Sequence, residues 1–562
     1  MAGLHKIIQK PFEQIMNLKK RHLYLLTLVS GLLLTFGWPA DGFPLFLFFA
    51  FVPLLIIEDF IYNHKEKFNR FSFFGYVFLS MLVWNLLTTY WIYFSTVVGV
   101  TLAVLLNSLF MALTLSLFHF TRTVLKHNSA YFTFILYWIA FEFLHLNWDL
   151  TWSWMNLGNG FANHPAWVQW YEFTGTFGGA LWILLVNYLI FHLLKLYISK
   201  GKTLRFRLLL TVAAAGLILL PIIISVIIYS VHDDKGKSVS VVVVQPNIDP
   251  YNEKFGGLSS EKQLARLLKL ARLETDANTR LLVGPETVIP EGVWEDMLDE
   301  SRSIDSLKHF IKKYPDLSIL VGLSSYKMFK PGETLSATAR RYSKTEWYDA
   351  YNTAMMLDTS DVVQLYHKSK LVPGVEKMPW SEHLTFLEKY ALDLGGIVGS
   401  LGVQDERSVF YSADSQIKAA PVICYESIYG EYVSEYVKNG ANIICVITND
   451  GWWEDTPGYK QHFDYASLRA IETRRSVVQS ANTGISGFIN QRGQVQQKTG
   501  WWKGDVLKQD VRLNEEITFY VKYGDYIGKA SFYMSAIILL YSLILSISKK
   551  IKRIFIRKKS LG

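Results

Sequence analysis

A cysteine, a glutamate and a lysine each follow a short apolar run in the second half of the chain. Cys424 follows AAPVI, Glu286 follows LLVGP and Lys368 follows VVQLYH. Continuous runs of this kind indicate strands that are covered on both faces, and ligands of α/β sheets bind beyond the carboxyl ends of such strands. We therefore expect the three side chains to share one site.

These three residue types could together carry out acyl transfer through a covalent intermediate. A thiol is a strong intrinsic nucleophile, and a glutamate can take its proton and later deprotonate an acceptor. Lys368 and the backbone N–H of Tyr425 could stabilise the developing oxyanion. Residues 427–439 are predicted to form a helix, whose N-terminus would favour the thiolate of Cys424.

Each residue alone has a simpler interpretation. A lone cysteine is more often a small buried hydrophobe, which is our interpretation of Cys445 in NIICVIT, and a lone glutamate or lysine after a strand is usually solvated. Two cysteines are too few for a disulfide framework, and they lack metal-ligand spacing. The chain contains no Walker loop, GxGxxG or HExxH pattern, so neither a metal nor a cofactor is expected.

The elements that must position this site fall into two compositional halves. The chain has 562 residues, too many for one ordinary domain. Seven apolar segments before residue 231, and an eighth near the end, are about long enough to cross a bilayer as helices. They are 23–38, 43–61, 72–94, 97–120, 130–147, 167–194, 208–230 and 527–547. The predicted parts are a basic leader (1–22), a transmembrane domain (23–230), a catalytic domain (231–526), a closing span (527–547) and a basic tail (548–562).

The positions of the basic residues indicate a membrane protein rather than a nucleic-acid-binding one. The net charge is +9, but lysine and arginine cluster beside the apolar segments. The alternate loops 39–42, 95–96 and 148–166 contain neither residue. This asymmetry predicts that both termini are cytoplasmic and that residues 231–526 lie outside the cytoplasmic membrane. The first segment lacks a small-residue cleavage site and is expected to be retained.

From Ser238 onward, short apolar runs alternate with amphipathic stretches, which predicts a layered α/β domain. Helices are expected at 259–274, 427–439 and 459–475. Residues 328–349 and much of 373–407 are expected to be surface loops. In the first half, the tryptophan-rich loop 147–166 is either an interfacial aromatic belt or part of a site, and Glu142 is either functional or paired with a polar neighbour.

Several motifs resemble a known superfamily. GPET around Glu286, YHKSKLVPGVE around Lys368 and CYES around Cys424 are similar to the flanks of the Glu-Lys-Cys triad of the nitrilase (carbon–nitrogen hydrolase) superfamily. TNDGWW (448–453) and SANTGISGFIN (480–490) extend the similarity. With the membrane segments and the WMNLG motif that begins at Trp154, nearly the whole chain resembles the bacterial apolipoprotein N-acyltransferase family.

The resemblance implies a multi-span helical domain, an outer α-β-β-α sandwich and a two-step reaction in the inner membrane. A phospholipid, typically phosphatidylethanolamine, would acylate Cys424, and the acyl chain would pass to the α-amino group of the diacylglyceryl-cysteine of an apolipoprotein, the last step of lipoprotein maturation. The enzyme would be a monomer without a cofactor. The implied roles are Glu286 as base, Lys368 as oxyanion stabiliser and Cys424 as nucleophile. Glu376, Tyr425 and Glu426 would support these three, and Trp154 would be a loop tryptophan near the lipid entry.

The chain also departs from the family pattern. LVPGVE stands where LVPFGE is usual, and Phe255 stands where a tryptophan is frequent, so only an aromatic lipid contact is expected there. The apolar segment 378–387, with Trp380, is expected to touch the bilayer or gate a lateral entrance. Two alternative functions remain. A membrane-tethered amidase would leave the membrane spans and the WMNLG motif unexplained. A transporter or scaffold with an inactive outer domain would leave the intact triad unexplained.

Overall fold

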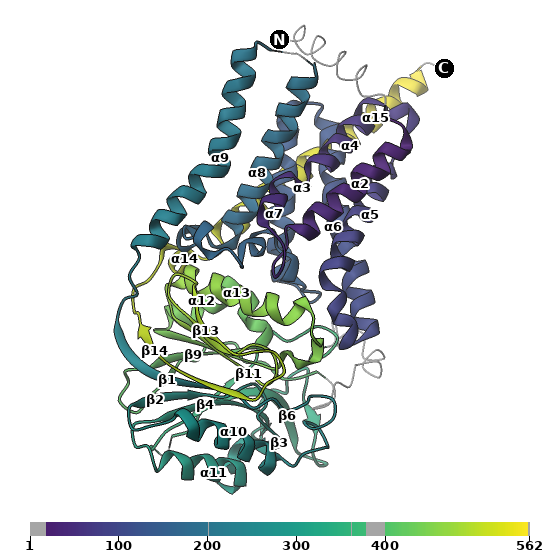
Figure 1. Cartoon of the computed structure of the whole chain (residues 1–562). Coiled ribbons are helices and arrows are strands. Elements are labelled where there is room, and N and C mark those ends of the chain that lie inside the picture. Colours follow the sequence, from purple (N-terminus) through teal and green to yellow (C-terminus); the bar gives the residue numbers. More distant parts are fainter. Residues whose placement is uncertain (1–17, 200–201, 361, 378–399, 560–562) are drawn as a thin grey trace.

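The computed structural model describes residues 18–199, 202–360, 362–377 and 400–559. A bundle of long helices stands on one side of an α/β domain, and the C-terminal helix α15 (Tyr526–Lys559) returns into that bundle (Figure 1). The two halves expected from composition are therefore two structural domains.

Seven helical stretches in the described part are long and apolar enough to cross a membrane. They run through Pro44–Asn63 (containing α3, Leu47–Ala50, and α4, Val52–Asn63), Ser72–Phe94 (α5, Ser72–Thr89), Val97–Leu125 (α6), Asn128–Leu146 (α7, Phe132–Leu146), Tyr171–Ser199 (α8), Leu204–Val231 (α9) and Tyr526–Ile556 (in α15). The first predicted span corresponds to α2 (Lys20–Phe36), which has only 17 residues, about 25 Å of helix. The number of spans therefore stays a prediction.

The bundle and the α/β domain meet at the end where α2 stops and α6 begins. Just after α2, the Trp38 indole donates a hydrogen bond to the Tyr465 hydroxyl, 3.2 Å away. Just before α6, the Ser95 hydroxyl donates to the Trp452 carbonyl at 3.0 Å. The last turns of α15 lie at the opposite end of the bundle, away from the α/β domain (Figure 1).

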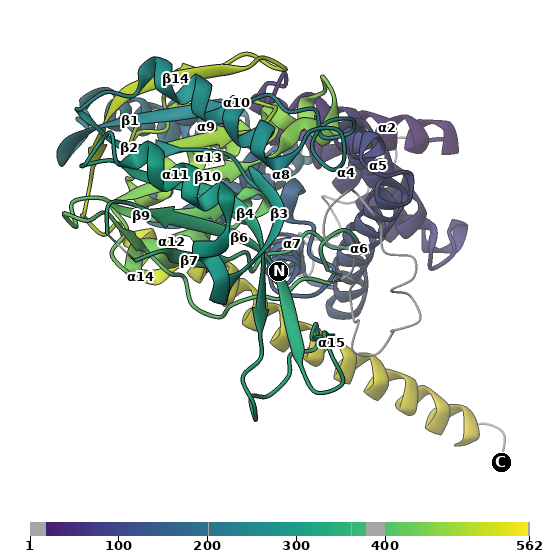
Figure 2. The same cartoon turned by 90° about the horizontal axis from the view of Figure 1, so that it is seen from below.

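The α/β domain is a four-layer α-β-β-α sandwich, as the resemblance implies. One sheet has the order β14-β1-β2-β4-β6-β5, with β3 beside β4 and β7 beside β6, and the other has the order β13-β12-β11-β10-β9-β8. Helices α10 (Ser260–Glu274) and α11 (Arg302–Ile311) cover the first sheet, and α12 (Gly430–Lys438) and α13 (Pro457–Thr473) cover the second (Figures 1 and 2). The strands are β1 (Lys237–Gln245), β2 (Thr279–Val283), β3 (Ile289–Trp294), β4 (Ser318–Met328), β5 (Arg340–Arg341), β6 (Trp347–Leu357), β7 (Gln364–His367), β8 (Phe410–Tyr411), β9 (Lys418–Ile423), β10 (Ile443–Thr448), β11 (Val477–Ala481), β12 (Gly487–Ile489), β13 (Val495–Lys498) and β14 (Asp505–Leu513).

The sequence explains these layers. Residues 241–244, all valine, are fully buried in β1, since the sheet is covered on both faces. Helix α10 starts after Ser259, whose hydroxyl accepts from the Lys262 amide, and it buries Leu264, Leu267 and Leu268 on one face. Strands β9, β10 and β11 are parallel, so their carboxyl ends lie at one edge of the second sheet.

The layer formed by α12 and α13 faces the membrane helices. Glu472 of α13 accepts from the Thr176 amide of α8 at 3.2 Å, and Arg474 pairs with Glu172 at 2.9 Å. Gly175 interrupts α8 with φ +59°, and a Cβ there would lie 2.2 Å from the Tyr520 ring, so only glycine permits this approach. These contacts fix the α/β domain on the bundle.

Two of the secondary-structure predictions were wrong, and several elements were missed. Residues 328–349 are not one loop, because β4 reaches Met328, β5 pairs with β6, and β6 starts at Trp347. The helix predicted for 427–439 starts only at Gly430, after a 3₁₀ turn over Cys424–Ile428. The sequence analysis also missed β3 and α11. Most of the predicted loop 373–407, including Trp380 and the rest of 378–387, lies outside the described residues.

Candidate active site

Glu286 lies in the loop that leaves β2 and is held close to β4. The Val288 amide donates to the Gly322 carbonyl at 2.9 Å, and the Gly322 amide donates to the Pro285 carbonyl at 3.0 Å. A Cβ on Gly322 would lie 2.8 Å from the Glu286 Cα, so this glycine permits the close approach of the two backbones. The loop thereby fixes the Glu286 carboxylate beyond the strand end.

Lys368 follows β7 and joins two carboxylates. Its Nζ lies 3.1 Å from Glu286 Oε1 and 2.8 Å from Glu376 Oε1, and its side chain is almost fully buried. The Asn352 amide on β6 donates to the same two oxygens, at 2.7 Å to Glu286 and 3.1 Å to Glu376. Glu376 is held in turn by the Val372 amide, 2.9 Å from Oε2. Two carboxylates therefore share one ammonium group and one amide.

This pairing sets the protonation states. Burial raises the pKa of Glu286, but the Lys368 charge and the Asn352 hydrogen bond outweigh it and hold the pKa below its ordinary value. Burial lowers the pKa of Lys368, yet the carboxylates of Glu286 and Glu376 hold it well above its ordinary value. Glu286 is thus ionised and Lys368 protonated at neutral pH.

Cys424 occupies a strained turn directly after β9. Its φ is +49°, which is uncommon for a residue with a side chain. The Glu426 carboxylate holds the turn, since it accepts from the Ile423 amide at 2.9 Å and from the Ser369 amide at 2.8 Å. It also accepts from the hydroxyls of Tyr366 and Tyr432. Glu426 therefore ties the cysteine turn to the chain just after Lys368.

The expectation that a helix N-terminus favours the Cys424 thiolate was wrong. Helix α12 begins six residues later, because the Glu426 carboxylate stabilises the intervening 3₁₀ turn. Burial raises the pKa of the Cys424 thiol well above its ordinary value, and the Glu286 carboxylate raises it further, while Lys368 lowers it. The Cys424 thiol is therefore neutral at rest, and a reaction at its sulfur requires that a neighbouring group take the thiol proton.

His462 of α13 lies beside the main-chain carbonyl of Cys424. Its Nε2 lies 3.2 Å from the Cys424 carbonyl oxygen and its Nδ1 lies 2.9 Å from Asp450 Oδ1. Nε2 also lies 2.9 Å from the Ser427 hydroxyl, which can donate or accept, whereas the Asp450 carboxylate only accepts, so Nδ1 is the nitrogen that donates to Asp450. Burial lowers the pKa of His462, but Asp450 outweighs burial and raises it. Thr448 at the end of β10 orients that carboxylate, with its hydroxyl 2.6 Å from Oδ1.

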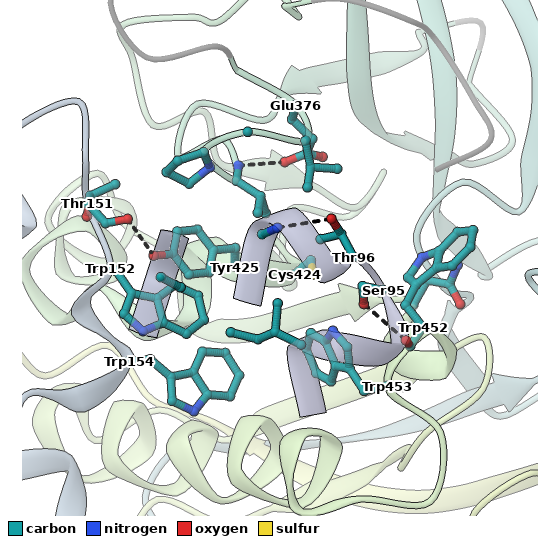
Figure 3. A pocket seen from close by; sticks show the side chains of 18 of the residues that line it. Ser95, Thr96, Thr151, Trp152, Trp154, Glu376, Cys424, Tyr425, Trp452 and Trp453 are labelled. Carbon is teal, nitrogen blue, oxygen red and sulfur yellow. Dashed lines mark hydrogen bonds between the residues drawn. The ribbon is translucent and has the colours of Figure 1, made fainter. Parts of the chain in front are cut away.

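These residues open into a cavity of about 490 Å³ that extends from the α/β domain to the helical bundle. In Figure 3, Cys424 lies between Trp152 and Trp154 on one side and Trp452 and Trp453 on the other. The rings of Trp152 and Trp154 stack with centroids 5.7 Å apart. One face of α6 completes the wall with Val98, Gly99, Leu102, Ala103, Leu106, Asn107 and Phe110.

The structure brings most of the predicted site residues together. Glu286, Lys368, Cys424, Glu376, Tyr425, Trp154 and Phe255 all line this cavity. Phe255 stacks on Trp452, with ring centroids 6.2 Å apart. Glu426 instead lies behind the wall, fully buried, and acts through the backbone of its neighbours. Trp380 lies outside the described residues.

The structure also bears on the two alternatives that the sequence left open for the loop 147–166 and for Glu142. Trp154 is 1% exposed and donates to the Gln461 side chain at 2.7 Å, so it is part of the site rather than of an interfacial belt. Glu142 is paired, because its Oε1 accepts from the Trp138 indole at 2.9 Å and from the Leu157 amide at 2.8 Å. It anchors the WMNLG loop and does not line the cavity.

The sequence analysis missed three residues of the site: Lys254, Asn352 and His462. Asn352 carried a signal, because it is a lone amide inside an apolar strand. His462 lies on the predicted helix 459–475 but had no assigned role. Lys254 lies in the polar segment between β1 and α10, where no pattern distinguishes it from a solvated lysine.

Replacing Asn352 with alanine should move the acid limb of the pH–rate profile to higher pH. The amide hydrogen bond is one of the causes that hold the pKa of Glu286 below 4.5, so its loss raises that pKa and the carboxylate becomes protonated at a higher pH. We also expect about a tenfold lower kcat/KM at neutral pH. The check is the pH dependence of the catalysed rate; an unmoved acid limb would show that Asn352 does not lower the pKa of Glu286.

Comparison with known proteins gives consistent matches along the chain. Residues 30–189 match the apolipoprotein N-acyltransferase N-terminal domain, and residues 240–519 match the carbon-nitrogen hydrolase family. Apolipoprotein N-acyltransferase from Chlorobaculum tepidum is 32% identical over 93% of this chain and 95% of its own length. That from Thermotoga maritima is 26% identical over 93% of each chain. The solved structure of Saccharomyces cerevisiae Nit3, of the nitrilase superfamily, is 14% identical, covers 53% of this chain and 96% of its own, and has a TM-score of 0.34.

Proposed function

The chain belongs to the apolipoprotein N-acyltransferase family, and on this premise we propose that it moves an acyl chain from a phospholipid, through a Cys424 thioester, to the N-terminal amino group of an apolipoprotein. N-acylation of this kind is the last step of lipoprotein maturation. The proposal assigns Glu286, Lys368 and Cys424 as the catalytic triad and phosphatidylethanolamine as the acyl donor.

One observation carries the proposal: the wall of the cavity at Cys424 includes exposed apolar side chains of a helix that is long enough to span a membrane. Val98 and Leu102 of α6 are 58% and 52% exposed on a helix of membrane-spanning length, yet they line the same cavity as the thiol. An acyl chain bound along this face could reach Cys424 without crossing water. An amidase for small soluble substrates would have no use for such a wall.

The first half-reaction forms the thioester. The Cys424 sulfur attacks the ester carbonyl carbon of the phospholipid while Glu286 takes the thiol proton. The Lys368 ammonium and the Tyr425 backbone N–H stabilise the oxyanion. The carbon–oxygen bond then breaks, and Glu286 returns the proton to the departing oxygen, which releases a lysophospholipid with a free hydroxyl.

The second half-reaction forms the amide. The amino group of the diacylglyceryl-cysteine attacks the thioester carbonyl, and Glu286 takes a proton from the attacking nitrogen. The carbon–sulfur bond breaks, and that proton goes to the departing Cys424 sulfur. Donor and acceptor thus use one cavity in turn, a ping-pong sequence that suits a single nucleophile with a single base.

The arrangement of the basic residues supports an orientation with the catalytic domain in the periplasm. The basic clusters around Lys20, Lys67, Lys126 and Lys195 adjoin the helix ends opposite the α/β domain. Cytoplasmic loops are enriched in such residues. We therefore place both termini in the cytoplasm and the active site at the outer leaflet of the inner membrane, where lipid donor and lipid-anchored acceptor both occur. The enzyme is proposed to act as a monomer.

Replacing Leu102 with asparagine should slow acylation of Cys424 from bilayer phospholipid by about tenfold. The substitution puts a polar amide on the apolar wall that the acyl chain would contact. Leu105→Asn is the matched control, since Leu105 is 44% exposed on the same helix but does not line the cavity. Intact-protein mass spectrometry follows the thioester. Equal acylation rates for the two variants would show that the acyl chain does not bind along the cavity-lining face of α6.

A further inference from the structure

The cavity holds a second lysine, whose charge is not matched by a carboxylate. Lys254 is 3% exposed and lines the cavity together with Cys424. Its Nζ donates to the main-chain oxygen of Glu286 at 3.0 Å. Lys368, by contrast, contacts two carboxylates. Within the described part of the chain, no acidic side chain lies within 4.0 Å of the Lys254 ammonium.

The hydrogen bonds of Lys254 leave one donor for a ligand. An ammonium group has three N–H donors, and the Glu286 carbonyl takes one. The Asn449 side chain, turned so that its oxygen faces Lys254 and the Trp452 indole, accepts from both at 3.3 Å. The remaining N–H has no protein partner among the described residues. The amine is therefore fixed in place by two neutral oxygens and keeps one donor.

The electrostatics favour an anionic ligand at this amine. Burial lowers the pKa of Lys254 to about 8, although the Glu286 carboxylate acts in the opposite direction. A buried cation without a counter-ion is unfavourable, and an anion beside it forms a strong charge-assisted hydrogen bond. Lys368 cannot serve in this way, because Glu286 and Glu376 already neutralise it.

We propose that Lys254 binds the phosphate of the donor phospholipid while Cys424 attacks its ester. This inference rests on the proposed function. The phosphate and the reacting ester belong to one molecule and are joined through the glycerol unit, so a cation close to the thiol is well placed for the phosphate. The recognised group is a phosphate diester, common to phospholipids with different headgroups, and the contact therefore selects phospholipids over uncharged acyl esters.

The test compares two acyl donors with the same chains, phosphatidylethanolamine and a phosphate-free diacylglycerol. Thioester formation on Cys424 is followed in the full-length protein, and the ratio of kcat/KM for the two donors is determined. Lys254→Met should lower this ratio by about tenfold, mainly through KM, because one charge-assisted hydrogen bond is lost. Lys254→Arg keeps the positive charge and should therefore keep most of the preference for phosphatidylethanolamine over diacylglycerol. Lys262→Met, an exposed lysine on α10, is the control for loss of a charge.

The alternatives give different results. An equal loss with both donors in Lys254→Met would overturn the proposal, because Lys254 would then act by positioning Glu286 or by stabilising the thiolate. Another outcome is that inorganic phosphate slows acylation of Cys424 equally from both donors in the wild type and has no effect in Lys254→Met. The amine would then bind free phosphate rather than the lipid phosphate, and the proposal would be overturned. A wild-type protein acylated by neither donor would instead refute the proposed function itself.

Discussion

Replacing Cys424 with alanine should abolish the acyl-enzyme and lower N-acylation by at least about 10³-fold, since loss of a covalent nucleophile removes the route itself. The measurement is the mass of the peptide that contains residue 424 after incubation with phospholipid, together with the N-terminus of an apolipoprotein acceptor. The wild-type peptide should gain one acyl chain, and the variant peptide should gain none.

The chain supplies its own control for this experiment in the second cysteine. Cys445 is fully buried in the middle of β10, so Cys445→Ala should retain the acyl-enzyme and lose only about 1 kcal/mol of stability. Residual N-acylation by Cys424→Ala in a background without other acyltransferases would contradict the assignment of the nucleophile.

Replacing Lys368 with methionine should lower the acylation rate by about 10²–10³-fold, because one oxyanion donor is lost. The same change leaves the buried Glu286 carboxylate and the partly buried Glu376 carboxylate without the ammonium group that they share, and breaking a buried pair destabilises a protein by about 3–5 kcal/mol. Removing the Lys368 charge also raises the pKa of Glu286. As the pH is lowered, the remaining activity should therefore begin to fall at a higher pH than in the wild type.

Two measurements separate these effects. Single-turnover acylation kinetics report the oxyanion contact, and the thermal unfolding midpoint reports the broken pair. Lys377→Met is the control, because Lys377 forms a half-exposed pair with Asp149 at 2.9 Å, and pairs that water reaches contribute little to stability. Acylation by Lys368→Met within threefold of the wild-type rate would exclude Lys368 from the transition state.

The strand ends could be predicted because each follows a continuous apolar run of neighbouring residues. Val241 to Val244 and the runs before Glu286 and Cys424 are continuous apolar stretches, which only a doubly covered sheet can bury. The structure brings these strand ends to one cavity. Membrane-length helices followed equally directly from apolar length.

The parts that sequence reasoning missed depend on contacts between distant segments. The late start of α12 follows from the Glu426 carboxylate, which bonds to the Ser369 amide 57 residues earlier in the chain. Lys254 is distinguished only by its burial against the loop of Glu286. Neither contact leaves a periodic pattern in the sequence, so no local rule could have identified them.

The central claim is that one thioester on Cys424 links a lipid donor to an amine acceptor. The most direct test isolates the protein after acylation by phospholipid with a labelled acyl chain, removes the donor, and adds a diacylglyceryl-cysteine peptide. The account predicts that the label leaves Cys424 and appears as an amide on the peptide N-terminus, with a rate that depends on peptide concentration. Release of the label as free fatty acid at a rate independent of the peptide would contradict acyl transfer and identify a hydrolase.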